Sequence, residues 1–182
     1  TFLAKGWNMD VKKNVREYQN LILERLAKCE TSIAELYEAY GKTFPETADF
    51  WQELSNEERN HAHYLKSLQV FLDKGNVFYN FDRLDAQILD NYIAGIKAQL
   101  AAVKSKALSL CDALTAAVSI ESSILESNFY DTVKSDAPDF EAVASRLLKD
   151  TKRHRETIKN QLTKKRPNWD RSGAARQKLF GN

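Results

Sequence analysis

The sequence predicts an all-α protein: a bundle of four long helices with one long crossover between the second and the third. Apolar residues recur at spacings of three and four over four long segments, which is the helical period. The six glycines and three prolines in 182 residues are too few for a turn-rich β architecture. About thirty residues separate Lys74 from Leu108, enough to return along a helix of roughly 40 Å.

The first two helices are predicted from apolar periodicity and from the residues that end them. The first runs from about Asp10 to Tyr40, with apolar side chains at 11, 15, 18, 22, 26, 29, 33, 37 and 40. The segment 41–45 begins with glycine and ends with proline, and it predicts the end of that helix. The second helix is expected from Pro45, since proline suits a first helical turn, to about Lys74.

The second half of the chain repeats this hairpin pattern. The crossover is expected to contain an extra helix from about 83 to 104. The third bundle helix is predicted from 108 to 134, with Ser109 and Asp112 at the spacing of an N-terminal cap. The fourth is predicted from 139 to 163. Short connections make each pair an antiparallel hairpin, and the crossover between the pairs makes the topology differ from simple up-down-up-down order.

Charge divides the chain into a bundle, residues 10–163, and a basic C-terminal tail, residues 164–182. The net charge is +2, but from Lys152 onward ten lysines and arginines face only Glu156 and Asp170. A solvated helix end is favoured over a nucleic-acid or acidic-partner surface, because cations suit the C-terminal end of a helix dipole.

Cysteine usage and hydropathy bear on the compartment. Cys29 and Cys111 form no CxxC pair and lie on apolar helical faces, so buried free thiols are expected. No segment approaches the roughly 18 apolar residues of a membrane span. The first ten residues lack the charged region, apolar region and cleavage site of a signal peptide. We therefore expect a cytoplasmic protein without a membrane partner.

Ionisable residues interrupt the apolar faces of all four helices. Glu58 and His61 lie three residues apart, so they share one face of the second helix. Burying them is costly unless something binds them, because the rest of that face is apolar: Trp51, Leu54, Leu65, Leu68 and Leu72. Glu30, Glu121 and His154 hold equivalent positions on the other helices. A lone histidine on such a face is most often a core residue, but this set predicts a metal site.

The heights of these residues along the bundle agree. Glu30 lies about eleven residues before the first hairpin turn, and Glu58 about thirteen after it. Glu121 lies about fourteen residues before the second turn, and His154 about sixteen after it. With a full-length crossover the two turns lie at opposite ends, so both levels fall near the middle. The ligand types, carboxylates with one imidazole per ion, suit two iron or manganese ions, with zinc as an alternative.

These residues resemble the ferritin-like superfamily, and within it the rubrerythrin branch, over about residues 10–163. The resemblance rests on Glu30 with Tyr37 seven residues later, on Glu58-x-x-His61, on Glu121 and on the last-helix histidine. It implies a di-iron centre in which Glu58 bridges and the other ligands each hold one ion: Glu30, His61, Glu121 and His154. Family members reduce peroxide, oxidise ferrous iron or store iron.

The resemblance also implies partners. A small oxidant, peroxide or dioxygen, is expected. The electron donor should be a separate molecule, since no rubredoxin domain is present, and the chain is expected to form a homo-oligomer. No residue is assigned a catalytic role. Two alternatives remain: a metal-binding or iron-handling protein without turnover, and a helical interaction module whose metal site has decayed.

The chain departs from the family pattern at two positions. Thr151 stands three residues before His154, where the family carries a glutamate, and Ile124 stands where rubrerythrins carry another. Asp150 is expected to be able to reach inward in place of the missing ligand. Glu57, at the border of the apolar face, and His63, off that face, are expected to be solvated, and Tyr37 could donate a hydrogen bond to a ligand.

Overall fold

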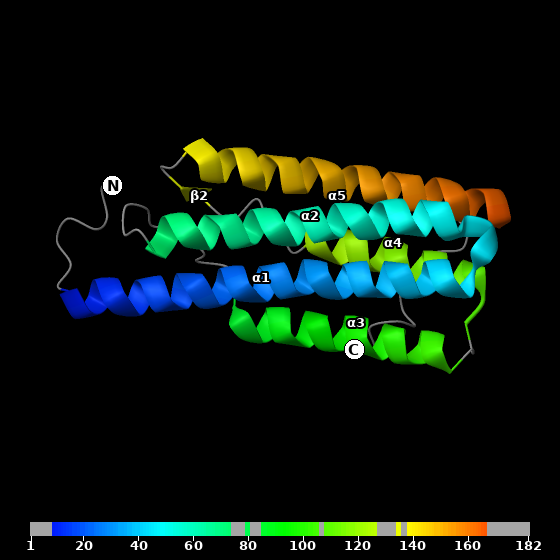
Figure 1. Ribbon diagram of the computed structural model, residues 1–182, viewed down its shortest axis with the longest axis horizontal. Coiled ribbons are helices and arrows are strands. Elements are labelled where there is room, and N and C mark those ends of the chain that lie inside the picture. The colour runs from blue at the N-terminus through cyan, green and yellow to red at the C-terminus, as the bar shows by residue number, and fades with distance from the viewer. Residues whose placement is uncertain are drawn as a thin grey trace.

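In the part of the chain that the structure describes, five α-helices pack together (Figure 1). The computed structural model describes residues 9–73, 79–80, 85–105, 108–126, 134–135 and 138–166. The helices in chain order are α1 (Met9–Thr43), α2 (Ala48–Asp73), α3 (Ala86–Lys104), α4 (Leu110–Glu126) and α5 (Pro138–Lys165). The all-α prediction is confirmed, and the assignment to a ferritin-like four-helix bundle stays a prediction.

The helices lie side by side, and the crossover returns along their length (Figure 1). α1 and α2 are antiparallel and joined at one end, whereas α5 begins near the opposite end and runs antiparallel to α4 (Figure 1). Between them α3 packs against α1, where Arg25 Nε lies 2.8 Å from Asp90 Oδ1. It also contacts α4, because the Tyr92 hydroxyl donates to Ile120 O at 2.8 Å. The extra helix is therefore a packed fifth helix.

The turn between α1 and α2 differs in detail from the prediction. α1 continues through Gly41 to Thr43, and η1 (Pro45–Thr47), one turn of 3₁₀ helix, precedes α2. Gly41 faces α2, where a Cβ on it would lie at ordinary contact distance, 3.4 Å, from Trp51 Cβ, and it does not end the helix. Pro45 supplies the stop.

The third bundle helix was predicted to extend to Lys134, and that end is wrong. α4 is described to Glu126, and 127–133 lie outside the described residues. Lys134–Ser135 form β2, which pairs antiparallel with β1 (Tyr79–Asn80). The pairing partner comes from the distant crossover, so local periodicity could not indicate it. The cap at the other end is confirmed, since Asp112 N donates to Ser109 Oγ at 3.2 Å and Ser109 N donates to Asp112 Oδ2 at 3.1 Å.

The core is continuous along the bundle, and Trp51, Tyr37 and Tyr40 are its largest fully buried side chains. Both cysteines are free; Cys29 is buried as predicted, and Cys111 is half-buried. Among the residues that the structure describes, no helix combines the length and apolar character needed to cross a lipid bilayer. Most of the predicted basic tail, residues 164–182, lies outside the described residues, which end at residue 166.

Candidate metal centre

Polar side chains from four helices meet in the middle of the core. The structure buries all five residues predicted as ligands, each at most 2 % exposed: Glu30 on α1, Glu58 and His61 on α2, Glu121 on α4 and His154 on α5. Their role as ligands stays a prediction. Ionisable groups this deep are stable only if each one is matched by another group or by an ion.

Glu58 lies at the centre of this cluster. Its Oε2 is 2.9 Å from His61 Nδ1, and its Oε1 is 2.7 Å from His154 Nδ1. One ligand atom from each of these three residues lies within 4.8 Å of those of the other two, so the group could hold a metal ion. The carboxylate thus offers one oxygen to each imidazole.

The other two carboxylates lie further out, one beside each imidazole. Glu30 Oε2 is 4.0 Å from His61 Nδ1, and Glu121 Oε1 is 3.8 Å from His154 Nδ1. Each histidine therefore faces Glu58 and one further glutamate. The predicted level of Glu121 with His154 agrees with the second contact, and Glu30, predicted to lie level with Glu58, lies beside His61, one turn further along α2.

Burial and mutual contacts determine the charges in the metal-free cluster. Burial, followed by the charge of Glu58, raises the pKa of Glu30 well above its usual value and that of Glu121 to about 8. Burial also raises the pKa of Glu58, but contacts with His154 and His61 outweigh it and lower the pKa below its usual value. Burial opposes protonation of the histidines, yet Glu58 raises the pKa of His61, and that of His154 to about 9. In the metal-free protein near neutral pH, protons on these glutamates and histidines therefore occupy the positions that metal ions could take.

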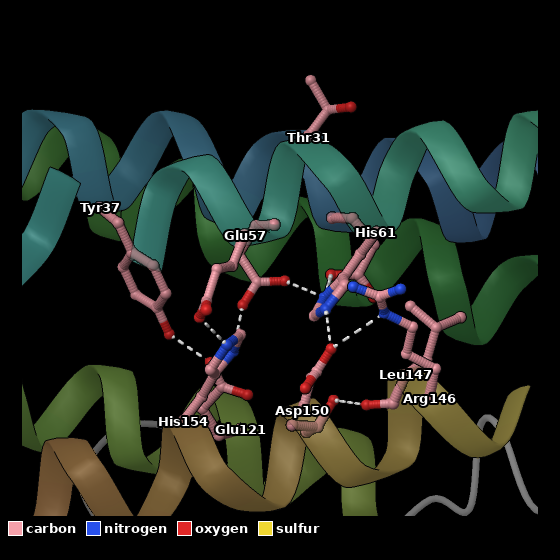
Figure 2. Close-up of polar contacts among 12 residues, drawn as sticks. Thr31, Tyr37, Glu57, His61, Glu121, Arg146, Leu147, Asp150 and His154 are labelled. Atoms are coloured by element: carbon pink, nitrogen blue, oxygen red, sulfur yellow. Dashed lines mark hydrogen bonds and ion pairs between the residues drawn. The ribbon is translucent and has the colours of Figure 1, made fainter. Parts of the chain in front are cut away.

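The Nε2 atom of each histidine contacts a third carboxylate, and each of these contacts joins α2 to α5. His61 Nε2 on α2 lies 3.4 Å from Asp150 Oδ2 on α5. His154 Nε2 on α5 lies 2.6 Å from Glu57 Oε2 on α2. Figure 2 shows the two pairs side by side. An Nε2–H bonded to a carboxylate fixes the ring orientation and directs Nδ1 into the cluster.

Two expectations about these outer carboxylates need correction. Glu57 is not simply solvated: it is 27 % exposed and contacts His154, and Arg153 donates to its Oε1 at 2.9 Å. Asp150 does not replace the missing ligand, because its carboxylate contacts His61 Nε2 and accepts from Arg153 at 3.3 Å. A sequence signal existed, since each acid precedes a histidine by four residues on its own helix.

The structure shows the surroundings of the two residues, Thr151 and Ile124, at which the chain departs from the pattern of the family that it resembles. Thr151 is buried and has no carboxylate to offer. Its hydroxyl donates to Leu147 O at 2.8 Å within α5. Ile124 is a buried core residue. Tyr37 makes the hydrogen bond considered for it, donating to Glu121 Oε1 at 2.7 Å. His63 is exposed as expected.

Removing either outer carboxylate should weaken metal binding without removing a ligand. We expect Glu57→Ala and Asp150→Ala each to lower metal affinity about ten- to a hundredfold, because the facing histidine loses its orienting acceptor. Chelator competition measures the affinity. Glu53→Ala, an exposed glutamate on α2, is the control. Unchanged affinity in both variants would show that these contacts do not orient the histidines.

Comparisons with protein-family models, with curated proteins and with solved structures find no match to this chain.

Proposed function

We propose that this protein is a rubrerythrin-like dimetal carboxylate protein that carries out redox chemistry on peroxide, dioxygen or ferrous iron. The observation that carries the proposal is Glu58, placed with one oxygen toward each of two buried imidazoles. Each imidazole also has its own neighbouring glutamate, Glu30 or Glu121. This is the donor set expected for one bridging and two terminal carboxylates.

The buried donors fit a cation. Glu58 Oε1 and His154 Nδ1 lie 2.7 Å apart, yet neither has a hydrogen-bond partner of good geometry among the described residues. Buried polar atoms are rarely left in this state. A cation bound between carboxylate and imidazole would satisfy both atoms.

The positions of the two imidazoles are compatible with two ions. The His61 and His154 rings are stacked, with centroids 5.4 Å apart and 22° between their planes. An imidazole binds a metal through a lone pair in its ring plane. Each ring can therefore hold an ion of its own, since Glu58 has one oxygen beside each Nδ1. Two ions, one held by each histidine with Glu58 as the shared carboxylate, would satisfy both rings.

Carboxylates and imidazoles together favour iron or manganese, with zinc as the alternative. Two ferrous ions can supply two electrons together to peroxide or dioxygen. The chain contributes a buried site, orients both histidines through Glu57 and Asp150, and hydrogen-bonds Glu121 through Tyr37. A separate electron donor and a homo-oligomer belong to the proposal.

A metal-binding or iron-handling protein without turnover is the second candidate, and Thr151 favours it because α5 supplies no carboxylate to the cluster. The third, a helical interaction module with a decayed site, predicts no bound metal. Elemental analysis of the protein purified without added metal separates the third from the other two.

Ferrous-loaded protein is expected to consume peroxide faster than dioxygen, with iron oxidation in the first turnover. Stopped-flow absorbance after mixing with each oxidant measures both rates, and Glu58→Ala given the same iron is the control. Loaded protein that leaves peroxide untouched would favour binding without turnover.

A further inference from the structure

We propose that Arg153 is a positioning residue that holds both imidazoles of the buried cluster in their orientation. Its consequence for metal binding rests on the proposed function, whereas the orientation itself is a property of the metal-free protein. Arg153 Nη2 donates to Glu57 Oε1 at 2.9 Å and to Asp150 Oδ1 at 3.3 Å. One guanidinium nitrogen of an exposed residue therefore joins the two acids that contact the histidines.

These contacts close a ring of six side chains between α2 and α5. Each outer acid offers its second oxygen to a histidine: Glu57 Oε2 lies 2.6 Å from His154 Nε2, and Asp150 Oδ2 lies 3.4 Å from His61 Nε2 (Figure 2). On the inner side, Glu58 joins the two Nδ1 atoms at 2.7 and 2.9 Å. Carboxylates alternate with nitrogen groups around the ring, whose members in order are Arg153, Glu57, His154, Glu58, His61 and Asp150.

The two histidine branches of this ring meet at its surface end in Arg153. Arg146 is the other arginine beside Asp150, with its Nε 3.7 Å from Asp150 Oδ2. Its guanidinium lies over the Tyr64 ring, 4.7 Å from the centroid, so its contacts concern the His61 branch. Arg153 instead contacts the acids of both branches, and it is therefore the residue through which one surface change can reach both histidines.

The charge of Arg153 keeps the two outer acids on the histidines. Glu57 and Asp150 are 27 % and 20 % exposed, so each can turn toward water. Two carboxylates beside one nitrogen repel each other unless a cation lies between them. The guanidinium supplies that cation and holds one oxygen of each acid by a charge-assisted hydrogen bond, which leaves the other oxygen for Nε2. Loss of Arg153 should therefore loosen both imidazoles, whereas loss of one acid should loosen one.

Hydrogen exchange of the imidazole protons in the metal-free protein tests the orientation, followed by nuclear magnetic resonance with isotope-labelled histidine. The chain has three histidines, and the exposed His63 is the internal reference. We expect Arg153→Ala to speed exchange of the Nε2 protons of both His61 and His154 at least about tenfold, because both lose a held acceptor. His63 should not change. Arg153→Lys should restore most of the protection, since an ammonium also has donors for two acids.

Arg155→Ala is the matched control. Arg155 lies two residues further along α5, and its Nε is 3.3 Å from Glu156 Oε1, a residue outside the ring. This variant should leave both buried histidines unchanged. In the Glu57→Ala, Asp150→Ala double variant, Arg153→Ala should add no further effect, because the arginine acts through these two acids.

Cobalt(II) titration of the same variants, with chelator competition, measures the consequence for the proposed centre. Arg153→Ala should lower affinity about ten- to a hundredfold, since the ligands lose their outer support, and Arg155→Ala should not. Unchanged cobalt affinity in Arg153→Ala would overturn this consequence.

The outcomes separate this proposal from the proposed function. Faster exchange at one buried histidine alone, unchanged exchange at both, or an equal effect of Arg155→Ala would overturn the shared role of Arg153 and leave the dimetal centre standing. Absence of cobalt binding in wild type would overturn the proposed function. Faster exchange at both histidines in metal-free Arg153→Ala would still support the role of the arginine.

Discussion

Glu58→Ala is expected to lower metal affinity at least a hundredfold and to remove most bound metal. Glu58 is the one inner carboxylate that lies within 3 Å of both imidazoles, with contacts of 2.9 and 2.7 Å. Its loss removes a ligand from both proposed ions and the negative charge between them. Elemental analysis after dialysis, together with chelator competition, measures occupancy and affinity.

The same variant should also be less stable without metal. Glu58 is the shared counter-ion of two buried histidines, and removing one partner of a buried pair typically costs about 3–5 kcal/mol. Chemical denaturation measures the loss. Glu53→Ala, at an exposed site five residues earlier on α2, is the matched control and should change neither property. Full metal occupancy in Glu58→Ala would show that this residue is not the bridging ligand.

Metal affinity is expected to rise steeply with pH, at least tenfold per unit between about pH 6.5 and 8, because cations must displace protons. The pKa of His154 is raised from 6.5 to about 9, and that of Glu121 from 4.5 to about 8. Each displaced proton contributes about a factor of ten per pH unit. Calorimetry at pH 7 in buffers of different ionisation enthalpy should show release of two or more protons, and pH-independent binding would contradict these protonation states.

Stability of the metal-free protein should change with pH in the opposite direction. A raised pKa stabilises the fold while the group is protonated, so the contribution of His154 is complete below 6.5 and lost as pH rises through about 9. The raised pKa of Glu121 has the same sign, and its contribution is lost as pH rises from 4.5 through about 8. Glu58 acts oppositely, because its pKa is lowered and its contribution is lost only in acid. The melting temperature without metal should therefore fall from about pH 6.5 to 9, and bound metal should remove this fall.

Much of the candidate site could be predicted because helical periodicity indicates which side chains of a helix are buried. The spacing of Glu58 and His61 on an apolar face predicted that both would be buried, and both are. The same argument held for Glu30, Glu121 and His154. Helix ends that depend on local residues, such as the Ser109–Asp112 cap, could also be predicted.

The sequence by itself determined the helices and which side of each faces the core. The tertiary structure decided which atoms meet across helices: Glu58 between two imidazoles, and Glu57 and Asp150 each on the histidine of the opposite helix. It also placed Lys134 in a strand pair instead of a helix. The physical reason is that periodicity determines the direction of a side chain from its own axis, whereas its contacts depend on how far neighbouring helices are shifted and rotated against each other.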